Sequence, residues 1–366
     1  MDIFEEMARR GHEQVVFCYD RETGLRLVVG IHDTTLGPAL GGCRMWTYAA
    51  EDDAVTDVLR LSQGMSYKNA AMGLDLGGGK CVILDGGQKT SDRAALFRAV
   101  GRFVNTLGGR YITAEDVGTS TEDMEAVAEE TPFVRGLKSR SGDPSPATAF
   151  GVFLAIKASL RHVFGSDDLE GRSVAIQGLG HVGMDLARRL FEEGARLLVT
   201  DIRPERIQFA EDHFEATCVR GDAIFGADAD VFAPCALGAV LNDATIPRLK
   251  VKIVAGSANN QLAEPRHAAM LAERGILYAP DFVVNGGGVI NVAAETGTYD
   301  PEAAMAKVAT IYDLLSDVFR RSDERGILPV QAAEEAARER IERAGRRMFM
   351  PHATPSPLAR GDAEKE

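Results

Sequence analysis

Two lysines and one aspartate are the residues whose types and surroundings could do chemistry. Lys68 lies in Gly64-Met-Ser-Tyr-Lys-Asn-Ala, and Lys80 ends Gly77-Gly-Gly-Lys; both segments are apolar and glycine-rich, where a lysine is costly to bury. Burial or a neighbouring cation turns a lysine into a general base, whereas a nearby carboxylate keeps it charged as an anion ligand. Asp116 sits where a short strand gives way to a loop, a usual place for catalytic side chains. Spacing alone leaves open the alternative of two surface lysines and a turn aspartate.

A second pattern is typical of a dinucleotide site. Gly178-Leu-Gly-His-Val-Gly183 follows an apolar strand and opens a helix, and Asp201 ends the next strand, 18 positions after Gly183. The three glycines allow a tight turn, a close approach of pyrophosphate to the backbone, and close packing of helix on strand. The helix N-terminus then attracts the pyrophosphate. The alternative is a glycine-rich turn that binds nothing, but the strand, helix and acidic residue in register favour binding.

Asp201 indicates which dinucleotide would bind. Its carboxylate would accept hydrogen bonds from the ribose hydroxyls and repel a 2′-phosphate, which favours NAD over NADP, although Arg203 weakens that preference. The residues predicted to bind the cofactor here are Gly178, Leu179, Gly180, His181, Val182, Gly183, Asp201 and Ile202.

Hydrophobic patterning predicts the elements that position these residues. The first third mixes strands and helices: strands over 15–18, 25–31 and 81–84, a helix over 51–64, and a helix capped by Ser91. Strands then alternate with helices: a helix over 150–164, a strand over 173–177, a helix to 193, a strand over 196–200, a helix from 204, and strands near 230–233 and 252–255. This alternation predicts βαβ units and a parallel sheet. Helical patterns continue over 301–347.

The fold class is therefore α/β with two domains. The polar stretch Lys138–Pro146 reads as the connection, so we expect one domain over 1–143 and a nucleotide-binding domain over 144–328. A C-terminal helix over 329–350 should pack back toward the first domain, and 351–366 should form a flexible tail.

Composition narrows the function classes. A net charge of −13 over 366 residues opposes nucleic-acid binding, no apolar run approaches the length that predicts a membrane span, and the charged N-terminus has no signal-peptide core. The five cysteines are scattered and the seven histidines show no ligand spacing, so neither a disulfide framework nor a metal site is indicated. We expect a cytoplasmic enzyme without a metal.

Several ordered motifs together resemble the amino acid dehydrogenase family, which contains the glutamate, leucine, valine and phenylalanine dehydrogenases. Besides the Lys68 and Lys80 segments, they are Gly37-Pro-Ala-Leu-Gly-Gly-Cys-Arg-Met-Trp, Ala114-Glu-Asp-Val-Gly-Thr, Ala233-Pro-Cys-Ala-Leu-Gly, Gly256-Ser-Ala-Asn-Asn-Gln and Tyr278-Ala-Pro-Asp-Phe-Val-Val-Asn. The resemblance spans roughly Glu13 to Glu295 and is weaker through the C-terminal helices. It implies an N-terminal domain with substrate and oligomer contacts, a C-terminal Rossmann domain, and a cleft between them.

The resemblance also implies roles. Lys68 would bind the substrate α-carboxylate, Lys80 would be the base that activates water, and Asp116 would exchange protons with the amino group. The reaction would be reversible oxidative deamination, in which a hydride passes from Cα to NAD and water attacks the iminium to give a 2-oxo acid and ammonium. By the same resemblance, the nicotinamide end of the cofactor site is lined by Thr148, Ala236, Leu237, Asn259 and Asn285.

Pocket residues indicate the amino acid. Glutamate dehydrogenases have a lysine at the position of Leu40, so here a glutamate side chain would be desolvated without a charge partner. Ala114, Val289 and Val292 match positions that shape the pocket of the leucine enzymes, and phenylalanine enzymes tend to have glycine and leucine at the first two. Such differences bias selectivity by about 1–3 kcal/mol. We expect leucine, with valine and isoleucine accepted, and a pocket lined by Leu40, Gly41, Met65, Lys68, Ala114, Val289 and Val292.

Alternatives remain at this stage. Gly286 and Ala294 stand where leucine enzymes usually have alanine and aspartate, which leaves the ranking among leucine, valine, isoleucine and phenylalanine open. A non-catalytic NAD-binding sensor would lack the two lysines, and an NADP-linked glutamate enzyme is opposed by Leu40 and Asp201. The resemblance implies a homo-oligomer, an octamer in the leucine enzymes.

Overall fold

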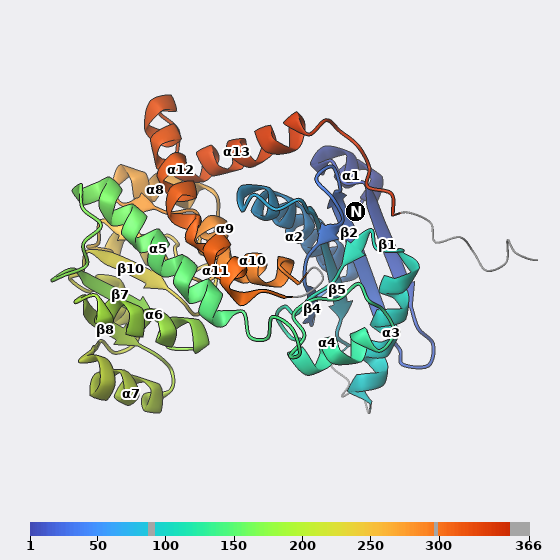
Figure 1. The fold of residues 1–366 in the computed structure, drawn as a ribbon, viewed down its shortest axis with the longest axis horizontal. Helices are drawn as coiled ribbons and strands as arrows, with labels where there is room; N and C mark the ends of the chain where they lie inside the picture. Colours follow the sequence, from blue (N-terminus) through green and yellow to red (C-terminus); the bar gives the residue numbers. More distant parts are fainter. Residues whose placement is uncertain (87–91, 296–298, 352–366) are drawn as a thin grey trace, which may run out of the picture. The chain divides into compact units, whose positions relative to one another are not determined.

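The chain forms two compact units in the computed structural model, which describes residues 1–86, 92–295 and 299–351 (Figure 1). The first unit comprises Met1–Ser66, Leu76–Val134 and Ala344–Glu366, and the second comprises Tyr67–Asp75 and Arg135–Arg343. The chain thus contributes a short segment, Tyr67–Asp75, to the second unit and enters it again at residue 135, ahead of the boundary at 143 expected from the polar stretch. The expected tail over 352–366 lies outside the described residues.

The first unit is built on a mixed sheet with strand order β1-β2-β5-β3-β6, with β4 paired to β5. β2 pairs antiparallel with β1 and β5, whereas β3 and β4 pair parallel with β5, and β6 pairs parallel with β3. Its elements are α1 (Ile3–Arg10), β1 (Gln14–Tyr19), β2 (Arg26–Asp33), β3 (Ala39–Leu40), β4 (Cys43–Trp46), α2 (Glu51–Ala71, whose last turn belongs to the second unit), β5 (Gly77–Leu84), α3 (Arg93–Thr106), β6 (Tyr111–Ile112) and α4 (Thr121–Ala128).

Helix α2 covers one face of this sheet through buried apolar side chains. Val55, Val58 and Leu59 pack with Val28 of β2 and Val82 of β5. The helix continues to Ala71, seven residues beyond its predicted end at 64, which places Lys68 in its last turn. Helix α3 is capped by Asp92, whose carboxylate accepts a hydrogen bond from the Ala95 N–H; the predicted cap, Ser91, lies outside the described residues.

The second unit is a doubly wound parallel sheet with strand order β12-β11-β10-β7-β8-β9. Its strands are β7 (Ser173–Gln177), β8 (Arg196–Thr200), β9 (Thr217–Cys218), β10 (Val231–Pro234), β11 (Ile253–Val254) and β12 (Leu277–Tyr278). Its helices are α5 (Ser145–Phe164), α6 (His181–Glu192), α7 (Pro204–Phe214), η1 (Gly221–Gly226), η2 (Ile246–Arg248), α8 (Arg266–Glu273), α9 (Asp281–Val284), α10 (Gly287–Ala293), α11 (Pro301–Ala309), α12 (Ile311–Arg325) and α13 (Pro329–Arg343).

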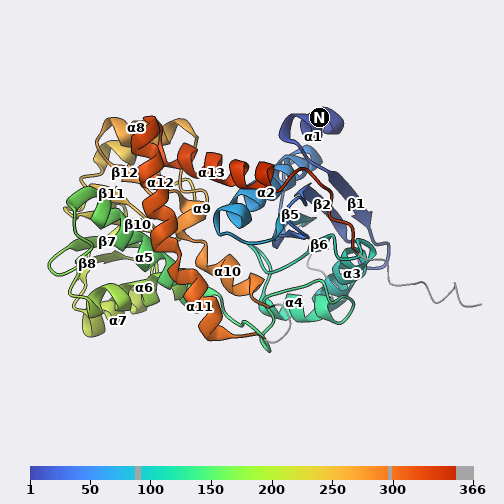
Figure 2. The same ribbon diagram turned by 45° about the horizontal axis from the view of Figure 1, so that its top comes forward.

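Alternate residues of the strands pack on opposite faces of this sheet. Val174 and Ile176 join a core with α5, α6 and α12, whereas Ala175 joins a second core with η1 and α8. Figures 1 and 2 show α5 and α12 side by side, and they are in contact. This strand order is that of the Rossmann fold, with the first strand, β7, beside the fourth, β10.

Helix α5 corrects one expectation from the sequence. By length and composition it could cross a membrane, although no such run was expected. Its buried residues pack against α6, α10 and α12 within the second unit. In this structure α5 is a core helix.

The last helix connects to the short segment 67–75. Arg340 of α13 donates hydrogen bonds to the Leu74 carbonyl oxygen at 2.6 Å and to the Asp75 carboxylate at 2.8 Å. These contacts join α13 to a segment that the sequence analysis assigned to the first domain and that belongs here to the second unit.

Two helical glycines give a matched stability test. A Cβ at Gly101 of α3 would lie 2.6 Å from the Val127 carbonyl oxygen, whereas a Cβ at Gly64 of α2 would meet nothing within 4 Å. We expect Gly101→Ala to destabilise the protein by about 1–3 kcal/mol through overpacking. Gly64→Ala should stabilise it by about 0.5–1 kcal/mol. Urea unfolding measures both, and equal effects would contradict the packing of α3 on α4.

Candidate active site

Lys80 and Asp116 form a buried ion pair in the first unit. Lys80 lies on β5, its side chain is almost fully buried, and its Nζ is 3.0 Å from Asp116 Oδ2. Burial alone raises the pKa of the Asp116 carboxyl, but the positive charges of Lys80 and Arg44 outweigh it and hold that pKa below its usual value. The structure therefore brings together the two residues predicted from the sequence to carry the chemistry, with the aspartate ionised.

The glycines around this pair let backbone segments approach closely. A Cβ at Gly42 would lie 2.8 Å from the Asp116 Cβ, and one at Gly79 would lie 2.6 Å from the ring of Tyr111. Tyr111 fills that space and donates a hydrogen bond from its hydroxyl to the Gly41 carbonyl oxygen at 2.7 Å. The glycine-rich sequence thus serves to pack the segments that carry Lys80 and Asp116.

Sequence reasoning missed Arg44, although it lies in a quoted motif. Its Nε donates to Asp116 Oδ2 at 2.9 Å, and its Nη1 donates to Asp57 Oδ2 at 3.0 Å. Asp57 also accepts hydrogen bonds from the Tyr48 hydroxyl and from Arg60. Lys80 and the tethered Arg44 guanidinium therefore contact the same oxygen of the Asp116 carboxylate. Its position one residue after a buried cysteine gave no signal of this contact.

The first unit also holds four of the predicted pocket residues. Leu40 and Ala114 are buried, and a Cβ at Gly41 would lie 3.2 Å from the Met65 Cγ. The Ala114 carbonyl oxygen accepts a hydrogen bond from the Cys43 N–H, which ties its segment to β4. Leu40, Gly41 and Ala114 are buried, Met65 is half-buried, and all four are uncharged, as a pocket for an apolar side chain requires.

Lys68 lies in the second unit, where it contacts a residue from the predicted cofactor site. Its Nζ donates to Asn285 Oδ1 at 2.6 Å, and Asn285 in turn donates to Asn259 Oδ1 at 2.8 Å. Val289 and Val292, the remaining pocket residues, are partly buried on α10, which begins two residues after Asn285.

The glycine turn has the geometry that its sequence predicts. Gly178 has a φ of +97°, and a Cβ there would lie 2.8 Å from the Ala236 Cβ. A Cβ at Gly183 would lie 2.0 Å from the Gly178 carbonyl oxygen, so helix α6 and the turn require glycine at both positions. No atom lies within 4 Å of a Cβ built at Gly180, which caps α6 without a side-chain hydrogen bond. That leaves space and unpaired N–H groups for a phosphate.

Asp201 is hydrogen-bonded to this turn. Its Oδ2 accepts from the Leu179 N–H at 2.6 Å and its Oδ1 accepts from the Arg203 N–H at 2.9 Å. Arg206 lies 3.8 Å from the same carboxylate. The acid is thus fixed at the end of β8, next to the first residues of the turn, where the fingerprint expects it.

The other predicted cofactor residues surround the carboxyl ends of the same strands. Ala236 and Leu237 are exposed after β10, and Asn259 is exposed after β11. Thr148 lies in the first turn of α5, with its hydroxyl donating to the Pro144 carbonyl oxygen. The remaining ones, His181, Val182 and Ile202, lie in the first turn of α6 and after β8, with His181 and Ile202 exposed. Ligands of parallel α/β sheets bind at this edge.

Glu295 is a second residue that sequence reasoning missed. It is buried at the end of the α10 segment, and its Oε1 accepts hydrogen bonds from the N–H groups of Gly136 and Ser141 at 3.0 Å and from the Ser141 hydroxyl. It thereby fixes the segment by which the chain enters the second unit. A lone glutamate before a glycine carries no sequence signal of this kind.

The departures at Gly286 and Ala294 now have a partial explanation. A Cβ at Gly286 would lie 2.0 Å from the Met72 sulfur, so glycine here makes room for Met72. Ala294 is the C-cap of α10, and nothing in the structure explains its loss of a carboxylate.

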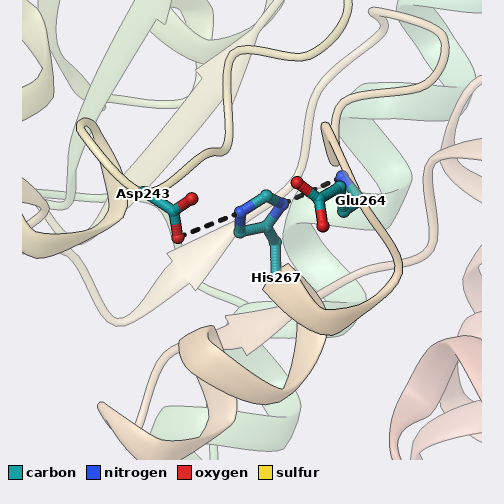
Figure 3. A group of neighbouring side chains, drawn as sticks. All are labelled: Asp243, Glu264 and His267. Atoms are coloured by element: carbon teal, nitrogen blue, oxygen red, sulfur yellow. Dashed lines mark hydrogen bonds and ion pairs between the residues drawn. The ribbon is translucent and has the colours of Figure 1, made fainter.

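One group in the described chain has the residue types of a metal site (Figure 3). His267 Nδ1 accepts a hydrogen bond from the Glu264 N–H at 2.9 Å, so a neutral ring carries its proton on Nε2, which faces Asp243 at 3.5 Å. A protonated nitrogen cannot bind a metal, and Arg266 already pairs with the carboxylates of Asp243 and Glu264. We interpret the group as an ion-pair cluster.

Comparison with known proteins places the chain in a family. Residues 12–133 match the model of the Glu/Leu/Phe/Val dehydrogenase dimerisation domain, and residues 141–203 and 199–348 match that of glutamate/leucine/phenylalanine/valine dehydrogenase. The chain is 54% identical to leucine dehydrogenase of Thermoactinomyces intermedius over 93% of this chain and 94% of the relative. It is 48% identical to phenylalanine dehydrogenase of Bacillus thermotolerans over 94% and 92%. The crystal structure of L-tryptophan dehydrogenase from Nostoc punctiforme superposes with a TM-score of 0.84, at 43% identity, over 94% of this chain and all of that one.

A Rossmann unit joined to an α/β unit with a buried Lys–Asp pair, together with these matches, defines an oxidoreductase acting on the CH–NH2 group of amino acids. The chain belongs to the Glu/Leu/Phe/Val dehydrogenase family. The resemblance inferred from the motifs is thereby confirmed.

Arg44→Gln tests the electrostatics of the site. Removing one of the two cations beside Asp116 should raise the pKa of its carboxyl, because less positive charge then offsets the pKa increase caused by burial. Carbon-detected NMR of the aspartate carboxyls against pH measures this, with Asp116→Asn to assign the signal. Arg60→Gln is the matched control, since Arg60 pairs with Asp57 and not with Asp116. An unchanged titration in Arg44→Gln would contradict the assigned contact.

Proposed function

We propose that the protein catalyses the NAD-dependent reversible oxidative deamination of L-leucine, and also of L-valine and L-isoleucine, to the 2-oxo acid and ammonium. The observation that carries the proposal is the Lys80–Asp116 pair, buried and flanked by an uncharged pocket, in a chain that is 54% identical to a leucine dehydrogenase.

The glycine turn, Asp201 and the residues after β10 and β11 would hold NAD. Space at Gly180 and the unpaired start of α6 fit a pyrophosphate, and the carboxylate of Asp201 fits ribose hydroxyls better than a 2′-phosphate. When bound, NAD accepts the hydride from the substrate Cα.

The side chains of the protein would supply positioning and proton transfer. Lys68 binds the substrate carboxylate as a fixed positive charge. Asp116, held ionised, takes a proton from the amino group. Lys80, after losing its own proton to solvent, deprotonates the water that attacks the iminium carbon. Collapse of the resulting carbinolamine gives the 2-oxo acid and ammonium.

The pocket supports an aliphatic side chain. Leu40 offers no charge to a distal carboxylate, and the Ala114 methyl would crowd a phenyl ring. The relatives include phenylalanine and tryptophan dehydrogenases, so an aromatic amino acid is the second candidate. We further propose a homo-oligomer, an octamer by resemblance, which the match to a dimerisation domain supports.

Initial rates of NADH formation with a panel of L-amino acids test this proposal directly. NADH formation should be fastest with L-leucine, then L-valine and L-isoleucine, and lowest with L-phenylalanine and L-glutamate. Phenylalanine ahead of leucine would keep the chemistry and overturn the pocket assignment. No rate with any of them would favour a non-catalytic NAD-binding protein.

Lys80→Ala tests the base. Turnover should fall by about 10²- to 10⁴-fold, the usual contribution of a positioned acid or base. NADH affinity should be retained because Lys80 lies outside the nucleotide-binding unit. Steady-state rates and NADH fluorescence measure the two quantities, and near-normal rates would refute the assigned role.

Leu40→Lys tests the charge of the pocket. A lysine there should raise the kcat/KM ratio of glutamate to leucine by about 10- to 100-fold, because it supplies the missing partner for a distal carboxylate. Leu40→Met has a similar volume and no charge, and it should leave the ratio unchanged. If both variants change the ratio equally, volume rather than charge sets the preference.

A further inference from the structure

The side chain of Asn285 joins residues that the sequence assigned to two different ligands. Its Oδ1 accepts a hydrogen bond from Lys68 Nζ at 2.6 Å, and its Nδ2 donates to the Ser257 carbonyl oxygen at 3.1 Å and to Asn259 Oδ1 at 2.8 Å. All four residues belong to the second unit, and Asn285 is only 4% exposed. The three contacts are part-buried, with Asn285 as their buried centre.

The chemistry of these partners fixes the direction of each amide. An ammonium group only donates, so the Asn285 atom that faces Lys68 is its oxygen. A carbonyl only accepts, so the atom that faces Ser257 is the Asn285 nitrogen, and both constraints give the same orientation. Because the Asn285 nitrogen donates to Asn259, the Asn259 atom that faces it is an acceptor. The side-chain oxygen of Asn259 therefore points toward Asn285.

The same constraint determines what Asn259 presents on its exposed side. With its oxygen occupied by Asn285, Asn259 keeps its NH2 group available as a donor. A nicotinamide carboxamide oxygen is an acceptor of the matching kind. Lys68 thus determines, through Asn285, that Asn259 presents a hydrogen-bond donor on the predicted cofactor surface.

We propose that Asn285 couples the two ligand sites, so that a 2-oxo acid bound at Lys68 raises the affinity of the protein for NADH. The inference rests on the function proposed above. When the carboxylate of the 2-oxo acid restricts the motion of the Lys68 ammonium, it also restricts the side chains of Asn285 and Asn259. The NH2 group of Asn259 is then already ordered when NADH binds. The ammonium has three N–H donors and can hold both partners. By linkage, NADH raises the affinity for the 2-oxo acid by the same factor.

The experiment measures the Kd of NADH by its fluorescence, with and without the saturating 2-oxo acid of leucine. Ammonium is left out so that no turnover occurs. The natural protein should bind NADH at least about fivefold more tightly when the 2-oxo acid is present, the lower end of typical coupling. Asn285→Ala should reduce this ratio to near one. Asn285→Asp keeps an acceptor for Lys68 but loses the donor to Asn259, and it should lose the coupling as well.

Asn291→Ala is the matched control. Asn291 is another buried side-chain amide with 4% exposure, and it contacts Ser141 and Tyr299 rather than Lys68 or Asn259. Its loss should lower the Tm as any buried amide deletion does and leave the coupling ratio intact. A purely structural role for Asn285 would make the two variants behave alike.

The outcomes separate this inference from the proposed function. Turnover of leucine without any effect of the 2-oxo acid on NADH affinity would overturn the coupling alone. Full coupling in Asn285→Ala and Asn285→Asp would also overturn it. Absence of both turnover and 2-oxo acid binding in the natural protein would overturn the proposed function itself.

Discussion

The buried pair of Lys80 and Asp116 is the constraint around which the first unit is organised. An unpaired ammonium at this depth would be strongly unfavourable, and so would an unpaired carboxylate. The close approach of their segments needs glycine at positions 42 and 79, where any larger residue would meet backbone or ring atoms. Arg44 then adds a second cation and balances the burial of Asp116. The same short segments therefore supply both the paired charges and the glycines that allow close packing.

The second unit accommodates its polar side chains in a different way. Its parallel strands are buried on both faces, so polar side chains gather where the strands end. Asp201, Asn259 and Asn285 lie at such ends or just beyond them, and each is oriented by hydrogen bonds within the unit. Binding residues that are already oriented lose less entropy when a ligand arrives.

Most of what the sequence predicted rests on local patterns. The glycine turn, its strand and Asp201 obey a short-range rule, and the structure has them in the expected places. Lys80 and Asp116 stood out by their glycine-rich or strand-end surroundings and took their roles from the family resemblance, and they pair as neighbours. Boundaries were less predictable: α2 runs on to Ala71 because its last turn still finds tertiary contacts, which no periodicity encodes.

The residues that sequence reasoning missed act over long separations in the chain. Arg44 reaches Asp116 across 72 positions, and Glu295 reaches Ser141 across 154. Nothing in the neighbourhood of either residue reveals such a partner, because the pairing depends on which strands and loops become adjacent. Helix α5 was expected over 150–164, but it begins at Ser145, and its full 20 residues form an apolar run that the shorter prediction did not include.

Met72 and Gly286 form a single packing unit from distant parts of the chain. The thioether of Met72 occupies the volume where a methyl group would stand at position 286. A methyl group at 286 therefore requires the Met72 side chain to move or to become smaller. The residue that position 286 tolerates thus depends on the residue at position 72, and the two positions are best exchanged together in any redesign of this part of the chain.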